Sequence, residues 1–243
     1  MIYITGDSHG NEMKFTRMGM DSEDSWTSED KLIICGDFGF VMYGDDKPAM
    51  KEHHEEILDR LAEKPYDILF VDGNHENFDR LYRFPQTVKY GNTVHKIRRN
   101  IFYLQRGRVY EIEGKTFFAF GGAYSVDKSA KKSQGLWWHE ELPDKEDFLR
   151  GRDALKNVNY KVDYIITHTA PGCVLEMLKY ALPYDLRNSF TFDIHENELR
   201  SYFDEIWNTV EFRCWYFGHF HFDKCLLLKA RALFIDVEII DDK

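Results

Sequence analysis

The stretch ILFVDGNHE, residues 68–76, runs from four apolar side chains directly into an acid, a glycine, a carboxamide, an imidazole and a second acid. Apolar, β-prone residues that lead into a glycine are typical of a buried strand entering a tight turn. Polar groups at the end of a buried strand cost folding free energy unless they are paired or bound to something. We therefore interpret this turn, residues 72–76, as a candidate functional site.

The chain of 243 residues fits one large domain or two small ones. It contains no repeat, linker or low-complexity tract, which predicts a single domain over residues 1–243. An apolar content of 43% and an aromatic content of 16% predict a globular protein rather than a disordered one. The formal net charge of -10 argues against a protein whose main task is non-specific binding to nucleic acid or anionic membrane.

The four cysteines form no C-x-x-C pair, so neither a zinc ribbon nor a thioredoxin-type redox motif is indicated. The N-terminus reaches a charge at Asp7, too soon for a signal peptide. No apolar run approaches the roughly 20 residues of a membrane span. We therefore expect a reduced, cytoplasmic protein with no membrane contact.

Five apolar runs lead into the same kind of polar turn. With a helix expected over residues 50–62, the early part has the strand–turn–helix–strand order of a βαβ chain, in which ligands lie at the carboxyl ends of the strands. The five strands are expected at residues 2–4, 31–35, 66–71, 164–167 and 214–217.

The middle and the end of the chain have a different character. Short β-like runs separated by tight turns predict an antiparallel meander over residues 94–120 and a closing antiparallel set over residues 226–237. Helices are expected over residues 145–156 and 193–207. Residues 121–143, rich in Lys, Ser and Gly and containing Trp137 and Trp138, are expected to form a loop that could serve as an active-site lid. The whole pattern predicts a mixed α/β fold.

Carboxylate, imidazole and carboxamide groups without thiolates suit divalent Mn, Fe or Zn rather than copper(I) or an iron–sulfur cluster. On an extended segment, i and i+2 side chains point the same way, so Asp7 with His9, and His219 with His221, are each expected to share a target. The candidate ligands in the five turns are Asp7, His9, Asp37, Asn74, His168, His219 and His221.

These seven ligands exceed the needs of one catalytic ion, which usually takes three and keeps an open position. Two ions about 3.5–4 Å apart, with one carboxylate between them, fit the set better. Such a pair orients a phosphoryl group and generates hydroxide at neutral pH. A lone histidine or Gly-Asp turn is usually structural, so the prediction depends on the repetition of the turns.

The segments GDSHG (6–10), GDFG (36–39), GNHE (73–76), TH (167–168) and GHFH (218–221) resemble the motifs of the calcineurin-like metallophosphoesterases, in the same order. The resemblance implies a four-layer αββα sandwich of two mixed sheets flanked by helices. It also implies one ion on Asp7, His9 and His221, a second on Asn74, His168 and His219, and Asp37 as the bridge. With the chemistry assigned in this way, Asp72 is expected to be structural, and Glu76 to orient His75 or cap the next helix.

The same resemblance implies hydrolysis of a phosphate mono- or diester by a metal-bound hydroxide. His75 would not be a ligand but the general acid, since an ordinary histidine pKa of about 6.5 allows it to hold and release a proton near neutral pH. The substrate would be a small-molecule or nucleotide-like phosphoester. Arg80, on a predicted helix, and His139, in the candidate lid, are weaker candidates for substrate binding.

Two positions depart from specialised members of the family. Phe38 follows Asp37 where the protein serine/threonine phosphatases carry a phosphate-binding arginine, which argues against a dedicated protein phosphatase. Ser8 stands where lariat-debranching enzymes carry cysteine, which argues against that activity.

A basic cluster at residues 96–99 and 106–108 leaves a nucleic-acid-processing nuclease as the alternative, although exposed strand ends explain these residues at least as well. A non-catalytic scaffold with the same fold is the third reading. It is disfavoured because the chain retains every ligand type and His75.

Overall fold

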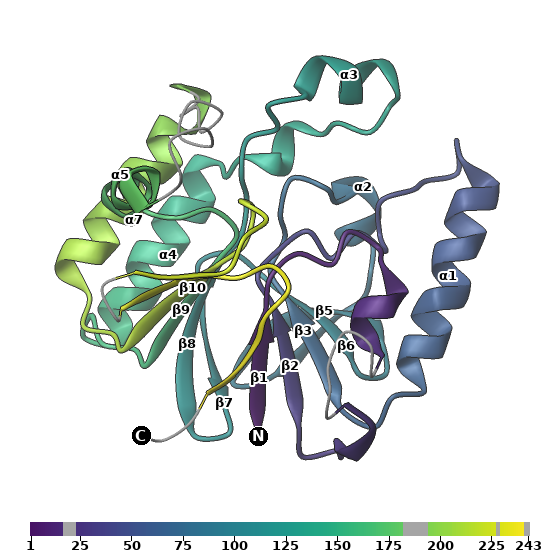
Figure 1. Cartoon of the computed structure of the whole chain (residues 1–243), viewed down its shortest axis with the longest axis horizontal. Helices are drawn as coiled ribbons and strands as arrows, with labels where there is room; N and C mark the ends of the chain where they lie inside the picture. Colours follow the sequence, from purple (N-terminus) through teal and green to yellow (C-terminus); the bar gives the residue numbers. More distant parts are fainter. Residues whose placement is uncertain (17–22, 182–193, 227–228, 241–243) are drawn as a thin grey trace.

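Two β-sheets pack face to face at the centre of the molecule, and helices cover their outer faces (Figure 1). The computed structural model describes residues 1–16, 23–181, 194–226 and 229–240. Within these ranges, one sheet has seven strands in the order β13-β1-β2-β3-β6-β5-β4, and the other has six in the order β11-β12-β10-β9-β8-β7.

In the seven-stranded sheet, β1, β2, β3 and β6 are parallel, while β13 and β5 pair antiparallel with β1 and β6. The edge strand β4 pairs antiparallel with β5. The parallel register brings the carboxyl ends of β1, β2 and β3 side by side. The strands are β1 (Ile2–Thr5), β2 (Lys31–Ile34), β3 (Asp67–Phe70), β4 (Gln86–Lys89), β5 (Asn92–Arg98), β6 (Ile101–Leu104) and β13 (Val237–Ile240).

In the six-stranded sheet, β8, β9, β10 and β12 are parallel, and β7 and β11 add antiparallel edges. The carboxyl ends of β9 and β10 therefore also lie together. The strands are β7 (Arg108–Ile112), β8 (Lys115–Phe120), β9 (Tyr164–Thr167), β10 (Cys214–Phe217), β11 (Lys224–Leu226) and β12 (Ala230–Ala232).

The helices divide between the two outer faces, with α1 on the seven-stranded side and α4, α5 and α7 on the six-stranded side (Figure 1). Each helix packs an apolar stripe of its surface against one of the two sheets. Helix α4 begins at a capping box formed by Asp144 and Asp147. The α-helices are α1 (Pro48–Ala62), α2 (Phe78–Leu81), α3 (Lys128–Ser133), α4 (Lys145–Asn157), α5 (Gly172–Ala181) and α7 (Asn197–Thr209). Short 3₁₀ helices span Glu12–Phe15, Glu23–Ser25, His139–Glu141 and Ile194–Glu196.

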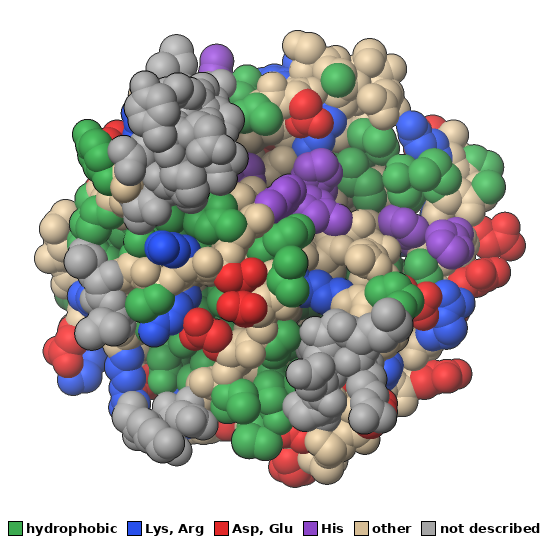
Figure 2. All heavy atoms as spheres, viewed as in Figure 1, with side chains coloured by type: hydrophobic (Ala, Val, Ile, Leu, Met, Phe, Trp, Pro, Cys, Tyr) green, Lys and Arg blue, Asp and Glu red, His purple; other side chains and the backbone are tan. Residues whose placement is uncertain are grey.

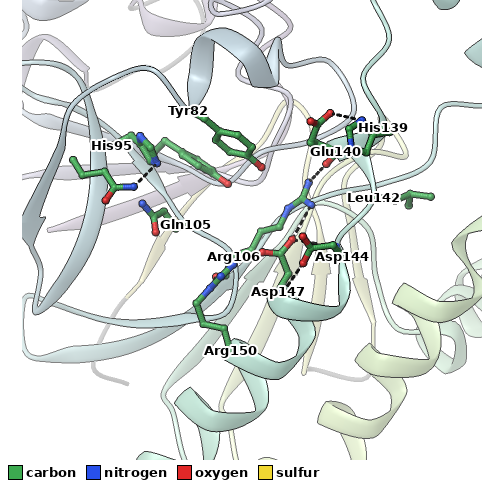
Figure 3. A pocket seen from close by; sticks show the side chains of 12 residues that line it. Tyr82, His95, Gln105, Arg106, His139, Glu140, Leu142, Asp144, Asp147 and Arg150 are labelled. Atoms are coloured by element: carbon green, nitrogen blue, oxygen red, sulfur yellow. Dashed lines mark hydrogen bonds and ion pairs between the residues drawn. The ribbon is translucent and has the colours of Figure 1, made fainter.

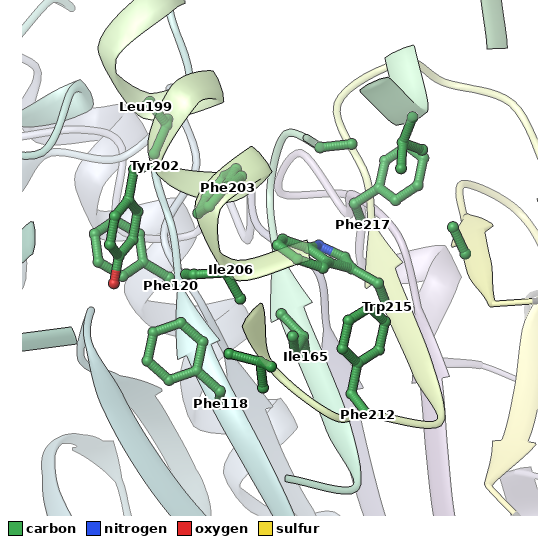
Figure 4. Close-up of a cluster of buried hydrophobic side chains, with 14 of the residues drawn as sticks. Phe118, Phe120, Ile165, Leu199, Tyr202, Phe203, Ile206, Phe212, Trp215 and Phe217 are labelled. Atoms are coloured by element: carbon green, nitrogen blue, oxygen red, sulfur yellow. The ribbon is translucent and has the colours of Figure 1, made fainter. Parts of the chain in front are cut away.

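Successive side chains along a strand point to opposite faces of its sheet, so each sheet has an apolar core on both faces. In β2, Ile33 packs in the core between the sheets, whereas Leu32 and Ile34 pack in the core that includes Leu58 of α1. A third core lies between the six-stranded sheet and its helices, around Trp215 (Figure 4). This arrangement confirms the predicted four-layer αββα fold. That residues 1–243 form a single domain remains a prediction, with which the core shared by the two sheets agrees.

Two sequence predictions about strand pairing are wrong. The expected meander is two antiparallel hairpins in different sheets, because the chain passes from β6 in one sheet to β7 in the other. The expected closing set is also divided: β11 and β12 pair antiparallel in the six-stranded sheet, while β13 pairs with β1. Short β-like runs separated by turns predict where strands occur, but the partner of each strand depends on packing between distant segments.

The other expected elements need smaller adjustments. The candidate lid, residues 121–143, is not a plain loop, since it contains α3 and the 3₁₀ helix His139–Glu141. The expected helix over residues 193–207 starts at a residue outside the described ranges, and α7 covers the rest after a 3₁₀ turn. Among the described residues, no helix is both long and apolar enough to cross a membrane.

Arg106, expected at an exposed strand end, is only 2% exposed and forms a buried ion pair with Asp72. Its Nε donates to Asp72 Oδ2 at 2.9 Å, and the hydroxyl of Tyr103 donates to Oδ1 at 2.8 Å. Asp72 therefore has the structural role expected of it, because these bonds satisfy its carboxylate at the end of β3.

Replacing Arg106 with methionine leaves the Asp72 carboxylate buried without its cation. We expect Arg106→Met to lower the free energy of unfolding by about 3–5 kcal/mol. The matched control is Arg152→Met, whose ion pair with Glu205 is about half exposed and should be worth less than about 1 kcal/mol. Urea unfolding of both variants measures the difference, and equal losses would contradict the structural role of the Asp72–Arg106 pair.

Candidate metal centre

Seven metal-type side chains come together where five parallel strands from both sheets end. The turns after β1, β2 and β3 face the turns after β9 and β10 because both sheets present their carboxyl ends to the same side. Histidine side chains gather near the centre of the face shown in Figure 2.

The first group comprises Asp7, His9 and His221, whose ligand atoms converge on one point. Oδ2 of Asp7 lies 3.1 Å from Nε2 of His221 and 3.4 Å from Nε2 of His9, and the two nitrogens are 2.8 Å apart. Asp7 Oδ2 is buried and makes no hydrogen bond with the described part of the chain. A buried carboxylate oxygen facing two imidazole nitrogens is an arrangement that a divalent cation would satisfy.

The second group is built around His168, which is fully buried. Its Nδ1 lies 2.8 Å from the carbonyl oxygen of Cys35, to which it can donate a proton. In the neutral ring, that bond leaves Nε2 without a proton and able to bind a metal ion, 3.3 Å from Asn74 Oδ1 and 3.3 Å from Asp37 Oδ2. The ring of His219 lies 4.9 Å from the ring of His168. A backbone carbonyl that fixes the orientation of an imidazole is a common support for a metal ligand.

Asp37 stands between the two groups. Its Oδ2 is 3.3 Å from His168 Nε2 and 3.7 Å from His9 Nδ1. Its Oδ1 accepts a hydrogen bond of 2.8 Å from the backbone N–H of His75. One carboxylate thus faces an imidazole from each group.

Four of the ligand residues have a left-handed backbone conformation rather than an extended one. The φ angles are 48° at His9, 47° at Asp37, 68° at His219 and 53° at His221. Residues other than glycine rarely adopt this region, and such strain is concentrated at functional sites. The expectation that His219 and His221 share a target is therefore wrong: the His219 ring lies beside His168, while His221 lies beside His9.

The carboxylates dominate the electrostatics of the cluster. Burial opposes protonation of His168, but Asp37 and Asp7 outweigh this effect and raise its pKa to about 10. Burial alone would raise the pKa of Asp37, yet His168 and the neighbouring histidines hold it well below its usual value. Burial and the charge of His168 lower the pKa of His219 to about 3. The buried carboxylates thus favour a positive charge on His168, whereas the ring of His219 stays neutral.

Glu76 has a different role from either one predicted. Its Oε1 accepts a hydrogen bond of 2.7 Å from the backbone N–H of Phe38, so it supports the turn that carries Asp37. The following helix, α2, is capped by Asn77 instead. Burial and the charge of Asp37 raise the pKa of Glu76.

The two weaker substrate-binding candidates are engaged elsewhere. Arg80 donates to the carbonyl oxygen of Tyr43 at 2.6 Å and forms an ion pair with Glu55. His139 is mostly exposed, lies 3.0 Å from Glu140, and lines a separate cavity of about 310 Å³ (Figure 3). Their roles in substrate binding remain predictions.

Lys131 of α3 reaches the cluster from the candidate lid. Its Nζ lies 3.0 Å from Nε2 of His75. The lysine-rich composition of the segment was the only sequence signal, and it does not distinguish Lys131 from Lys128 or Lys132.

Two cavities meet the cluster at His9. One, of about 270 Å³, is also lined by His75, Lys131 and Tyr43. The other, of about 520 Å³, is more apolar and is bordered by Phe234. The cluster is therefore open to a cavity on each side of His9.

A family model described as calcineurin-like phosphoesterase matches residues 1–223. The chain belongs to this family. No curated protein matches it. Membership in the calcineurin-like phosphoesterases indicates a metal-dependent hydrolase of phosphoesters, and the clusters of ligand atoms described above agree with that chemistry.

Gly73 permits the close approach of two ligand residues. A Cβ atom at Gly73 would lie 2.1 Å from Asp37 Oδ1 and 2.7 Å from His168 Nε2. We expect Gly73→Ala to weaken metal binding at least about tenfold, as measured by calorimetric titration of the metal-free protein. Gly114→Ala is the control, because Gly114 has a φ of 73° but no neighbouring atom within 4 Å. Equal metal affinities in the two variants would show that this packing does not matter.

Proposed function

We propose that this protein hydrolyses a phosphate mono- or diester with the help of two divalent metal ions. The observation that carries the proposal is the position of Asp37, which faces an imidazole of each ligand group. A carboxylate shared between two sets of ligands is the arrangement expected of a binuclear centre.

The ligand assignment follows the two groups. Asp7, His9 and His221 would hold one ion, and Asn74, His168 and His219 the other, with Asp37 contributing to both. The buried Asp7 Oδ2, which faces two imidazole nitrogens, and the mixed oxygen and nitrogen donor set support this assignment. When bound, the two ions would neutralise the charge of the phosphate and lower the pKa of water at the site. The donor set suits Mn, Fe or Zn.

His75 is the proposed general acid. Asp37 accepts a hydrogen bond from its backbone N–H, which holds the backbone of His75 beside the ligand cluster, and the centre of its ring is 5.0 Å from that of the His9 ring. From this position the ring would donate a proton to the leaving-group oxygen. The substrate class is a small-molecule or nucleotide-like phosphoester, for which the cavities on both sides of His9 leave room.

The nuclease alternative loses part of its basis, because two arginines of the basic cluster are paired with acids. Arg106 is buried against Asp72, and Arg98 is paired with Glu55 and Asp59. A non-catalytic scaffold remains disfavoured because His75 and the candidate ligands are placed together. The cytoplasmic location remains a prediction.

A phosphoester panel tests the proposed activity. We expect protein loaded with Mn, Fe or Zn to hydrolyse aryl phosphate monoesters or diesters, and removal of the ions with a chelator to abolish turnover. Elemental analysis establishes the metal content before the assay. Failure on the whole panel while two ions stay bound would overturn the proposal.

The role of His75 has its own test. We expect His75→Ala to lower kcat by about 10²–10⁴-fold, because proton donation to the leaving group is lost while the metal ligands remain. His53→Ala, at an exposed position on α1, is the control and should leave kcat unchanged. An unchanged kcat in His75→Ala, with both ions present, would remove His75 from the mechanism.

A further inference from the structure

Helix α3 carries Lys131 from the candidate lid into the metal centre. Figure 1 shows α3 above the carboxyl ends of the strands, and Lys131 is only 5% exposed there. Its Nζ lies 3.0 Å from His75 Nε2, 3.1 Å from the carbonyl oxygen of Asn74 and 2.9 Å from Ser125 Oγ. An ammonium group has three N–H donors, so these three acceptors account for all of them.

Ser125 makes this arrangement specific. Its hydroxyl lies 2.6 Å from Oε2 of Glu141, to which it can donate, and it accepts from Lys131 and from Nδ2 of Asn74 at 3.1 Å. The Asn74 amide is thereby oriented with its Oδ1 toward His168. A network in which each donor has an acceptor holds its members in one geometry.

The lid segment is held in place by contacts at a distance from Lys131. Trp138 Nε1 donates to Asp79 Oδ2 of α2 at 3.0 Å, and Lys47 Nζ donates to the carbonyl oxygen of Gln134 at 2.8 Å. The position of Lys131 therefore depends on how the lid packs against the seven-stranded side of the molecule.

The hydrogen bond to His75 has a chemical consequence. Because Lys131 can only donate, Nε2 of His75 must accept, and the ring proton of neutral His75 is placed on Nδ1. When Nδ1 passes its proton to a leaving-group oxygen, Nε2 takes a proton from the Lys131 ammonium 3.0 Å away. The ring thus stays neutral, and Lys131 is left as a neutral amine that solvent protonates again.

We propose that Lys131 is the positioning residue for His75: seating of α3 sets the ring so that it donates through Nδ1. This inference rests on the proposed role of His75. It extends that role by linking the general acid to the position of the lid, since both depend on the same hydrogen bond.

The first test reads the hydrogen bond directly and needs neither metal nor turnover. Two-bond ¹H–¹⁵N spectra of histidine-labelled protein, at alkaline pH where the ring is neutral, report which nitrogen of His75 carries the proton. We expect the Nδ1–H form in the unmodified protein and in Lys132→Met, and a shift toward the Nε2–H form in Lys131→Met. Lys132 is the matched control, because it lies on the same helix with its Nζ over the ring of Trp137.

The second test is kinetic and uses metal-loaded protein. We expect Lys131→Met to lower kcat about 10–100-fold with little change in KM, Lys131→Arg to recover part of the rate, and Lys132→Met to leave it unchanged. An ¹⁵N pattern in Lys131→Met that matches the unmodified protein, or a change confined to KM, would overturn the inference. If the unmodified protein lacks phosphoesterase activity, the proposed function fails, and the spectra alone decide whether Lys131 positions His75.

Discussion

Two buried carboxylates, those of Asp7 and Asp37, are the constraint on which the rest of the site depends. Asp7 is 2% exposed and Asp37 is 1% exposed, so each needs compensating charge and hydrogen bonds. Oδ1 of Asp7 accepts a hydrogen bond from the backbone N–H of His219, and Oδ1 of Asp37 accepts one from the backbone N–H of His75. Both donors belong to other turns. These hydrogen bonds therefore hold distant turns together and leave the Oδ2 atoms of both carboxylates facing imidazole rings.

The two-sheet architecture supplies the turns that meet these carboxylates. Parallel pairing within each sheet puts strand ends side by side, and packing of the sheets brings the two edges together. The end of β3 is further secured by the buried Asp72–Arg106 pair, which also joins it to the segment following β6. The turns that carry the ligands are thus held in place by the strands that they follow. The candidate lid adds Lys131 from outside the sheets.

Much of the fold and of the site could be predicted from the sequence. The five strand-end turns and the ligand types in them follow from periodicity and from the cost of burying polar groups. The four-layer fold and the separate roles of Asp72, Asn74 and His75 followed from the resemblance to a known family. Strand partners could not be predicted in this way, because β7 and β13 are placed by packing between segments far apart in the chain. The role of Glu76 was missed for the same reason: its partner, Phe38, lies 38 residues away.

The sequence by itself determined which chemical groups are available and that they follow buried strands, because both are properties of neighbouring residues. Only the tertiary structure decided how those groups are shared. Left-handed turns direct His219 toward His168 and His221 toward His9, against the rule for extended chains. Likewise, only the packing of α3 distinguishes Lys131 from its neighbouring lysines. These outcomes depend on contacts between residues distant in sequence, which no local pattern specifies.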